Sequence, residues 1–81
     1  MNQHNPPHPG EFIARNYVEA MQLSKLELAS KLGLGIDILD QLLSGKLAVD
    51  KELAERLSNT LGRSAEVWLL MQQHYDNFNR S

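Results

Sequence analysis

The stretch from Leu23 to Lys46, LSKLELASKLGLGIDILDQLLSGK, decides the fold. Ser24 is followed three residues later by Glu27, a capping-box pattern that predicts the first turn of a helix. Gly33 supplies a residue that accepts a positive φ angle, as a tight turn between two helices requires. Ala29, four residues earlier, is small enough to let a second helix cross closely. Together these features predict a helix-turn-helix.

Leucines at the remaining positions of this stretch fit the same motif, which is expected to span residues 24–44. The two helices need an aliphatic interface where they cross. An ordinary leucine-rich αα-hairpin would also show such leucines. The alanine, the glycine and the capping box are therefore stronger evidence for the motif than the leucines are. The positions concerned are Leu28, Leu32, Leu34, Leu39 and Leu42.

A further helix is predicted on the N-terminal side of the motif. Pro9 suits the first turn of a helix, and Glu11 lies favourably against the helix dipole there. The polar, proline-rich residues 1–8 before it are expected to form a flexible tail. The apolar stripe of this helix recurs at helical spacing, at Ile13, Tyr17, Ala20 and Met21.

Two more helices are predicted after the motif. Asp50 is a natural N-cap for the first of them and Gly62 ends it, while Ser64 caps the second. No stretch alternates apolar and polar residues with the period of two that is typical of a half-buried strand. The predicted fold class is therefore all-α, a single five-helix domain over residues 9–81.

Composition limits the kind of protein this can be. With 81 residues, 42% hydrophobic and 22% charged, the chain is typical of one small globular domain. It has no apolar run long enough to span a membrane and no signal-peptide core, so we expect a cytoplasmic protein without a membrane partner. The absence of cysteine excludes disulfides and Cys-based zinc sites. The formal net charge of −2 does not by itself favour DNA binding.

No group of residues points to catalysis or to a bound metal. His4 and His8 lie four residues apart, but the proline-containing segment between them does not form the helix that would pair them as ligands. The serines at helix ends are explained by capping, and neither a glycine-rich phosphate loop nor a catalytic triad is present. We therefore expect no enzyme, cofactor, metal or small-molecule substrate.

The second helix of the motif is the expected recognition helix, whose N-terminal residues enter the major groove in this class of motif. Gln41 has the chemistry that reads adenine, isoleucine suits the thymine methyl group, and aspartate accepts from cytosine N4. Both aspartates also oppose binding, because phosphates carry like charge. The residues expected to contact DNA are Ser24, Lys25, Gly35, Ile36, Asp37, Ile38, Asp40, Gln41 and Lys46.

Two other interpretations of the recognition helix remain open. Ile36 and Ile38 are also explained if they pack beneath the following helix, with the aspartates in solvent. Exposed isoleucine beside aspartate is, alternatively, typical of a protein-binding patch. In that case the motif is mainly a protein-interaction module with weak or no sequence-specific DNA binding.

The last helix is apolar on most of its faces, which predicts that most faces are buried. A domain this small covers about one side, so we expect a homodimer to cover part of the rest, with burial in the domain core alone as the alternative. A two-fold dimer places two recognition helices about 34 Å apart, suited to a palindromic site. The expected interface residues are Trp68, Leu70, Met71, Tyr75 and Phe78.

Short signatures spread along the chain carry a family resemblance: His8-Pro9-Gly10-Glu11, Ser44-Gly45-Lys46, Ala54-Glu55-Arg56-Leu57, Trp68-Leu69, and Gln72 with Tyr75-Asp76. With them, the chain resembles the HigA/VapI antitoxins of bacterial toxin–antitoxin modules from about His8 to Phe78. These are Xre-like helix-turn-helix proteins with a lambda-repressor-like fold.

The resemblance implies a dimer that binds operator DNA, represses its own operon and neutralises a cognate toxin, an mRNA-cleaving nuclease in the HigB type. The chain departs from the family at Leu70, where asparagine is common, and at Met71, which replaces a leucine. A larger departure is the recognition helix, which is acidic and aliphatic.

Overall fold

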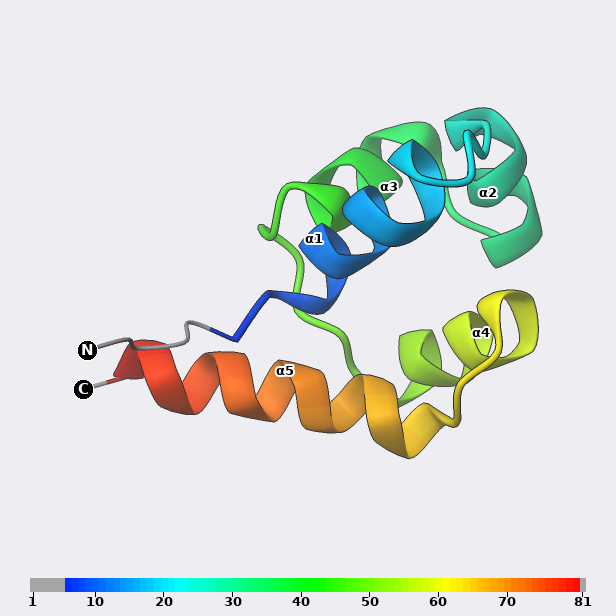
Figure 1. Ribbon diagram of the computed structural model, residues 1–81. Helices are drawn as coiled ribbons and strands as arrows, with labels where there is room; N and C mark the ends of the chain where they lie inside the picture. Colours follow the sequence, from blue (N-terminus) through cyan, green and yellow to red (C-terminus); the bar gives the residue numbers. More distant parts are fainter. Residues whose placement is uncertain (1–5, 81) are drawn as a thin grey trace.

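Helices form all the regular structure of residues 6–80, the part of the chain that the computed structural model describes. Figure 1 shows α5 lying along one side of the molecule, with α1, α2 and α3 grouped on the other side. The predicted all-α class with five α-helices is confirmed. In chain order the elements are α1 (Pro9–Ile13), the π-helical η1 (Ala14–Glu19), α2 (Lys25–Leu32), α3 (Ile36–Leu43), α4 (Lys51–Leu61) and α5 (Ala65–Arg80).

Side-chain caps begin three of the helices where the sequence predicts them. The N-cap side chain accepts the backbone N–H three residues further on, at 3.3 Å for Ser24, 2.9 Å for Asp50 and 3.3 Å for Ser64. Each cap satisfies one of the N–H groups that a helix start leaves without a partner. Gly62 ends α4 with a φ of +86°.

The predicted helix-turn-helix is formed by α2 and α3. Gly33 ends α2 in the left-handed conformation, with φ +72°, and the N–H of the next residue donates back to the Ala29 carbonyl at 2.9 Å. Ala29 is 4% exposed, as a close crossing of the two helices requires. The leucines that face each other between the helices are completely or almost completely buried: Leu28, Leu32, Leu39 and Leu42.

The first predicted helix is interrupted by the π-helical η1. In this turn the N–H of residue i+5 donates to the carbonyl of residue i, so the turn holds more residues than an α-helical turn. The spacing of 3.6 residues that puts Ala20 and Met21 on the buried stripe therefore does not apply beyond Tyr17. Ile13 is completely buried, but Met21 is 68% exposed, and the predicted stripe is wrong at its C-terminal end.

The hydrophobic core lies where α5 packs against the other helices, and Trp68 of α5 is its largest buried side chain. This side chain is completely buried, and its indole N–H donates to the Gly62 carbonyl at 3.2 Å. Its ring packs edge-on against the Phe12 ring, with the ring centroids 6.1 Å apart. All five α-helices contribute to the buried apolar set, which comprises Ile13, Leu28, Ala29, Leu32, Leu39, Leu42, Leu43, Val49, Leu53, Ala54, Leu57 and Trp68.

The N-terminal segment is folded onto the domain from His8 onward. His8 is 1% exposed and is the N-cap of α1, with Nδ1 accepting the Gly10 N–H at 2.9 Å. The sequence places His8 in a flexible tail over residues 1–8, and for this residue that expectation is wrong, because the ring is packed inside the domain. Residues 1–5 of the expected tail, His4 included, lie outside the described residues.

Candidate nucleic-acid interface

The outward face of α3 carries most of the residues predicted to contact DNA. Asp37 and Gln41 are exposed, one helical turn apart, and lie on the side opposite the buried leucines of the helix. Ile36 and Ile38 are 37% and 38% exposed, so the interpretation in which they pack beneath α4 is wrong. Gly35, the N-cap of α3, is exposed as well.

The predicted phosphate contacts lie at the two ends of the motif. Ser24 and Lys25 begin α2, and both are exposed. Lys46 is exposed just after α3, and its backbone N–H donates to the Gln41 carbonyl at 2.8 Å, which ties this residue to the last turn of the helix. The hydroxyl oxygen of Ser24 already accepts an N–H as a helix cap.

Two of the residues predicted to contact DNA form an ion pair with each other. Lys25 Nζ lies 3.4 Å from Asp40 Oδ1, an ion pair that joins α2 to α3. Both side chains remain about half exposed, at 53% and 56%, so the pair adds little to stability. Its effect is electrostatic, because the ammonium compensates one of the two carboxylates on the recognition helix. Residues 15 positions apart show no periodic signal, so the sequence analysis missed this pair.

Arg56 of α4 supports the turn of the motif, a role that the sequence analysis missed. Its Nη1 donates to the carbonyls of Leu32 and Gly33, at 2.9 and 3.3 Å, and its Nη2 donates to Glu52 at 3.0 Å. The guanidinium thereby satisfies carbonyls that the end of α2 leaves without helical partners. The signature Ala54-Glu55-Arg56-Leu57 marks Arg56 in the sequence, but it does not indicate that the side chain supports the turn.

The signatures at both ends of the chain position α3. Gly10 lies so close to α3 that a Cβ atom at this position would collide with the Leu42 carbonyl oxygen. At the other end, the buried Gln72 accepts the Val49 N–H through Oε1 at 2.8 Å, which fixes the segment between α3 and α4 to α5. Gln72 Nε2 in turn donates to Asp76 Oδ1 at 2.9 Å.

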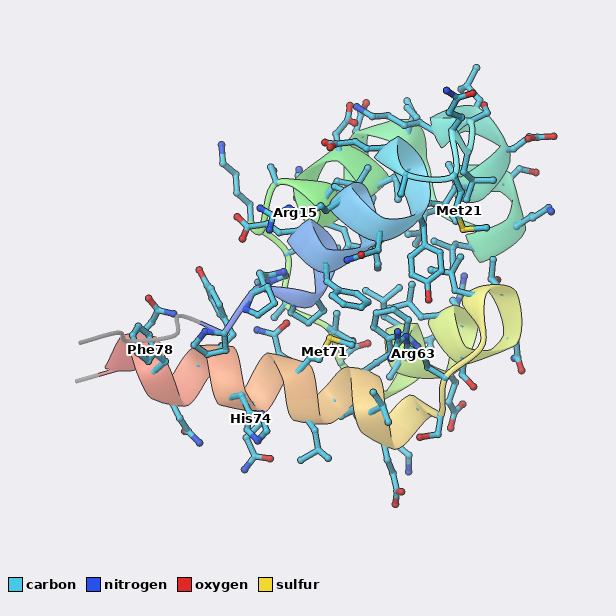
Figure 2. The ribbon with its side chains drawn as sticks, viewed as in Figure 1. Arg15, Met21, Arg63, Met71, His74 and Phe78 are labelled. Carbon is cyan, nitrogen blue, oxygen red and sulfur yellow. The ribbon has the colours of Figure 1, made fainter. Side chains whose placement is uncertain are left out.

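The residues expected at a dimer interface divide into two sets. Trp68 is completely buried in the core of one chain, so its prediction as an interface residue is wrong: it has no surface left to contact a partner. Met71 points from α5 toward the domain (Figure 2), and Tyr75 packs on His8. Leu70 and Phe78, at 48% and 41% exposed, keep substantial apolar surface.

The described residues contain no other arrangement that suggests a site. Among residues 6–80, no group of three or more His, Asp or Glu side chains is placed to hold a metal ion. His74 points away from the domain (Figure 2). None of the helices in the described part of the chain combines the length and the apolar character needed to cross a bilayer.

Comparison with known proteins gives a consistent result, although no protein-family model matches the chain. The chain is 35% identical over 72 residues to virulence-associated protein A of Dichelobacter nodosus, covering 88% of this chain and 71% of that protein. It is 32% identical over 72 residues to the uncharacterized HTH-type transcriptional regulator YddM of Escherichia coli K12, covering 89% and 76%.

Solved antitoxin structures share the fold. Antitoxin GraA superposes with a TM-score of 0.85 at 30% identity, covering 94% of this chain and 82% of that chain. A HigA-family addiction module antidote protein from Coxiella burnetii gives 0.82 at 30% identity, with coverages of 91% and 80%. Antitoxin HigA of Pseudomonas aeruginosa, solved with the higBA promoter, has the same fold at 23% identity, with a TM-score of 0.82 and coverages of 90% and 79%.

The fold and the outward recognition helix define a helix-turn-helix regulator of the Xre-like class. The chain belongs to the HigA/VapI family of antitoxins and transcription regulators. The members of this family are not enzymes, in agreement with the prediction from the sequence.

Proposed function

We propose that this protein is an antitoxin that binds operator DNA through α3, represses its own operon and neutralises a cognate toxin of the HigB type. The observation that carries the proposal is the outward face of α3, where Asp37 and Gln41 are exposed at the centre, while Ile36 and Ile38 are 37% and 38% exposed. In a helix-turn-helix, this is the face that enters the major groove.

Phosphate contacts would flank this face. Lys46 is exposed at the C-terminal end of α3, and Ser24 and Lys25 are exposed at the start of α2. Contacts of this kind fix the register of a protein on the duplex, while the side chains of the recognition helix read base edges. The structure of Pseudomonas aeruginosa HigA with the higBA promoter supports DNA binding by a protein of this fold.

A homodimer is part of the proposal, because one recognition helix reads only a half-site. The exposed apolar side chains of α5, Leu70 and Phe78 above all, support a contact between two copies. A two-fold dimer would present two α3 helices about 34 Å apart to successive major grooves of a palindrome. The protein would act in the cytoplasm, where operator DNA is found.

A second candidate is a protein-interaction module that keeps the fold but binds DNA weakly. It is favoured by the charge of the motif, in which three lysines between Lys25 and Lys46 are balanced by Glu27, Asp37 and Asp40. The exposed isoleucines of α3 would then contact a protein.

A gel-shift series with the promoter of its own operon, over increasing salt concentration, separates the two candidates. Specific retardation that weakens with salt and is lost in Gln41→Ala supports the proposed function. Gln73→Ala is the matched control, since Gln73 is exposed on α5. Absence of retardation even at low salt would refute operator binding.

The toxin is tested separately. A small basic nuclease-like reading frame beside the gene is expected, and its product should co-purify with this chain and lose its toxicity on co-expression. A toxic neighbour that neither binds this chain nor is neutralised by it would contradict the antitoxin role.

A further inference from the structure

Asp37 has an unusual place among the charges of the recognition helix. The ion pairs of the described residues are Lys25–Asp40 and Arg56–Glu52, and neither includes Asp37. Asp37 lies in the first turn of α3 and is exposed, on the same face as Gln41. The end of the helix that would approach the bases therefore carries a carboxylate that no lysine or arginine of the described residues pairs with.

A carboxylate is a selective probe of the major groove. When ionised it accepts hydrogen bonds and donates none. Cytosine N4 and adenine N6 present amino donors in the major groove, whereas guanine O6 and N7 and thymine O4 present acceptors. A carboxylate facing an acceptor gains no hydrogen bond and meets like partial charge.

We propose that Asp37 is a specificity-determining residue of the operator contact, admitting a base with an exocyclic amino group, cytosine or adenine, and rejecting guanine and thymine. This inference rests on the proposed DNA-binding function. Asp40 does not share the role, because its carboxylate is already held by Lys25 at 3.4 Å.

The helix geometry places the Asp37 contact near that of Gln41. Four residues of α-helix span about 6 Å, or about two base pairs at 3.4 Å each. The position at which Asp37 acts therefore lies within about two base pairs of the position at which Gln41 reads adenine.

Asp37 also has a cost for binding, since phosphates repel a carboxylate on every DNA sequence. Removing its charge should move affinity and specificity in opposite directions. The Asp37→Ala variant, which removes both the charge and the hydrogen-bond acceptor, gains affinity for all DNA but loses discrimination at one base pair of each half-site. If Asp37 acted only through its negative charge, removing that charge would raise the affinity for every DNA sequence equally and leave the base preference unchanged.

Selection from a randomised DNA library at low salt, using the full chain, tests the proposal. Wild type should enrich cytosine or adenine at one position of each half-site. Asp37→Ala should lower that preference by about fivefold or more. Asp40→Ala is the matched control, since it makes the same change of charge and size on the same helix, and it should leave the preference intact. Circular dichroism confirms that each variant is folded.

The outcomes distinguish a failure of the inference from a failure of the proposed function. Single substitutions in the selected site distinguish cytosine from adenine as the base that is admitted. Enrichment of guanine or thymine at the Asp37-dependent position, or an unchanged preference in Asp37→Ala, overturns the inference while operator binding stands. If none of the proteins enriches any sequence, the proposed function fails and the inference falls with it.

Discussion

The imidazole ring of His8 meets the phenol ring of Tyr75 edge-on, with centroids 4.9 Å apart and ring planes at 81°. This contact joins the N-cap residue of α1 to α5. Burial lowers the pKa of His8 from its ordinary value of 6.5, against the carboxylates of Glu11 and Asp76, which raise it. Above pH 6.5 the imidazole is therefore mainly neutral in the folded protein, as an acceptor of the Gly10 N–H must be.

The first prediction is that acid destabilises the protein through His8. Because the pKa is lower in the folded than in the unfolded chain, the contribution is fully present above pH 6.5 and is lost as the pH falls through the folded value. The melting temperature of His8→Asn, which keeps an acceptor but does not titrate, should fall less between about pH 7 and pH 5. His74→Asn, changed at an exposed histidine, should follow wild type. Parallel curves for all three proteins would contradict this role of His8.

The second prediction concerns the close approach of α1 to α3. Gly10→Ala should destabilise the fold by about 1–3 kcal/mol or more, because the new Cβ collides with the Leu42 carbonyl oxygen. Gly35→Ala is the control, since no atom lies within 4 Å of a Cβ there. Urea denaturation measures both changes. Equal midpoints for the two variants would show that α1 and α3 are not in close contact.

The third prediction tests the buried amide of Gln72. Gln72→Met keeps the volume but leaves the Val49 N–H without its acceptor, which should cost about 1–3 kcal/mol in the free energy of unfolding. The same change at the exposed neighbour Gln73 should cost less than about 0.5 kcal/mol. A similar loss in both variants would mean that the hydrogen bond contributes nothing.

The fourth prediction separates Lys46 and Lys25, the two lysines proposed to contact phosphates. Lys46→Ala should reduce the slope of log affinity against log salt by about 1, as the loss of one phosphate contact does. Lys25→Ala should reduce it by less, because Asp40 competes with the phosphate for that ammonium. In an Asp40→Asn background, Lys25→Ala should then have the full effect. Identical slope changes in the two backgrounds would exclude the competition.

The fifth prediction concerns assembly. Leu70→Glu should shift the protein from dimer to monomer in light scattering over a range of concentrations, because it places a charge on the exposed apolar surface of α5. Asn59→Glu adds the same charge at an exposed position of α4, away from this surface, and should leave the assembly state unchanged. If Leu70→Glu remains dimeric, the contact between copies lies elsewhere.

The amino-acid sequence by itself determined the features that depend on near neighbours along the chain. The caps at Ser24, Asp50 and Ser64, the left-handed Gly33 and the small Ala29 each act within a few residues. A cap or a tight turn needs only a local side chain or backbone freedom, so the order of residues along the chain is enough to predict the helix-turn-helix.

The tertiary structure alone decided which faces are free and which charges pair. The sequence pattern of α5 predicts Trp68 at a surface, but packing of α5 against the other helices buries it completely. Lys25 and Asp40 both appear as free DNA contacts until α2 and α3 cross and bring them to 3.4 Å. Burial and ion pairing depend on distances between residues far apart in the chain, and those distances exist only once the helices have packed.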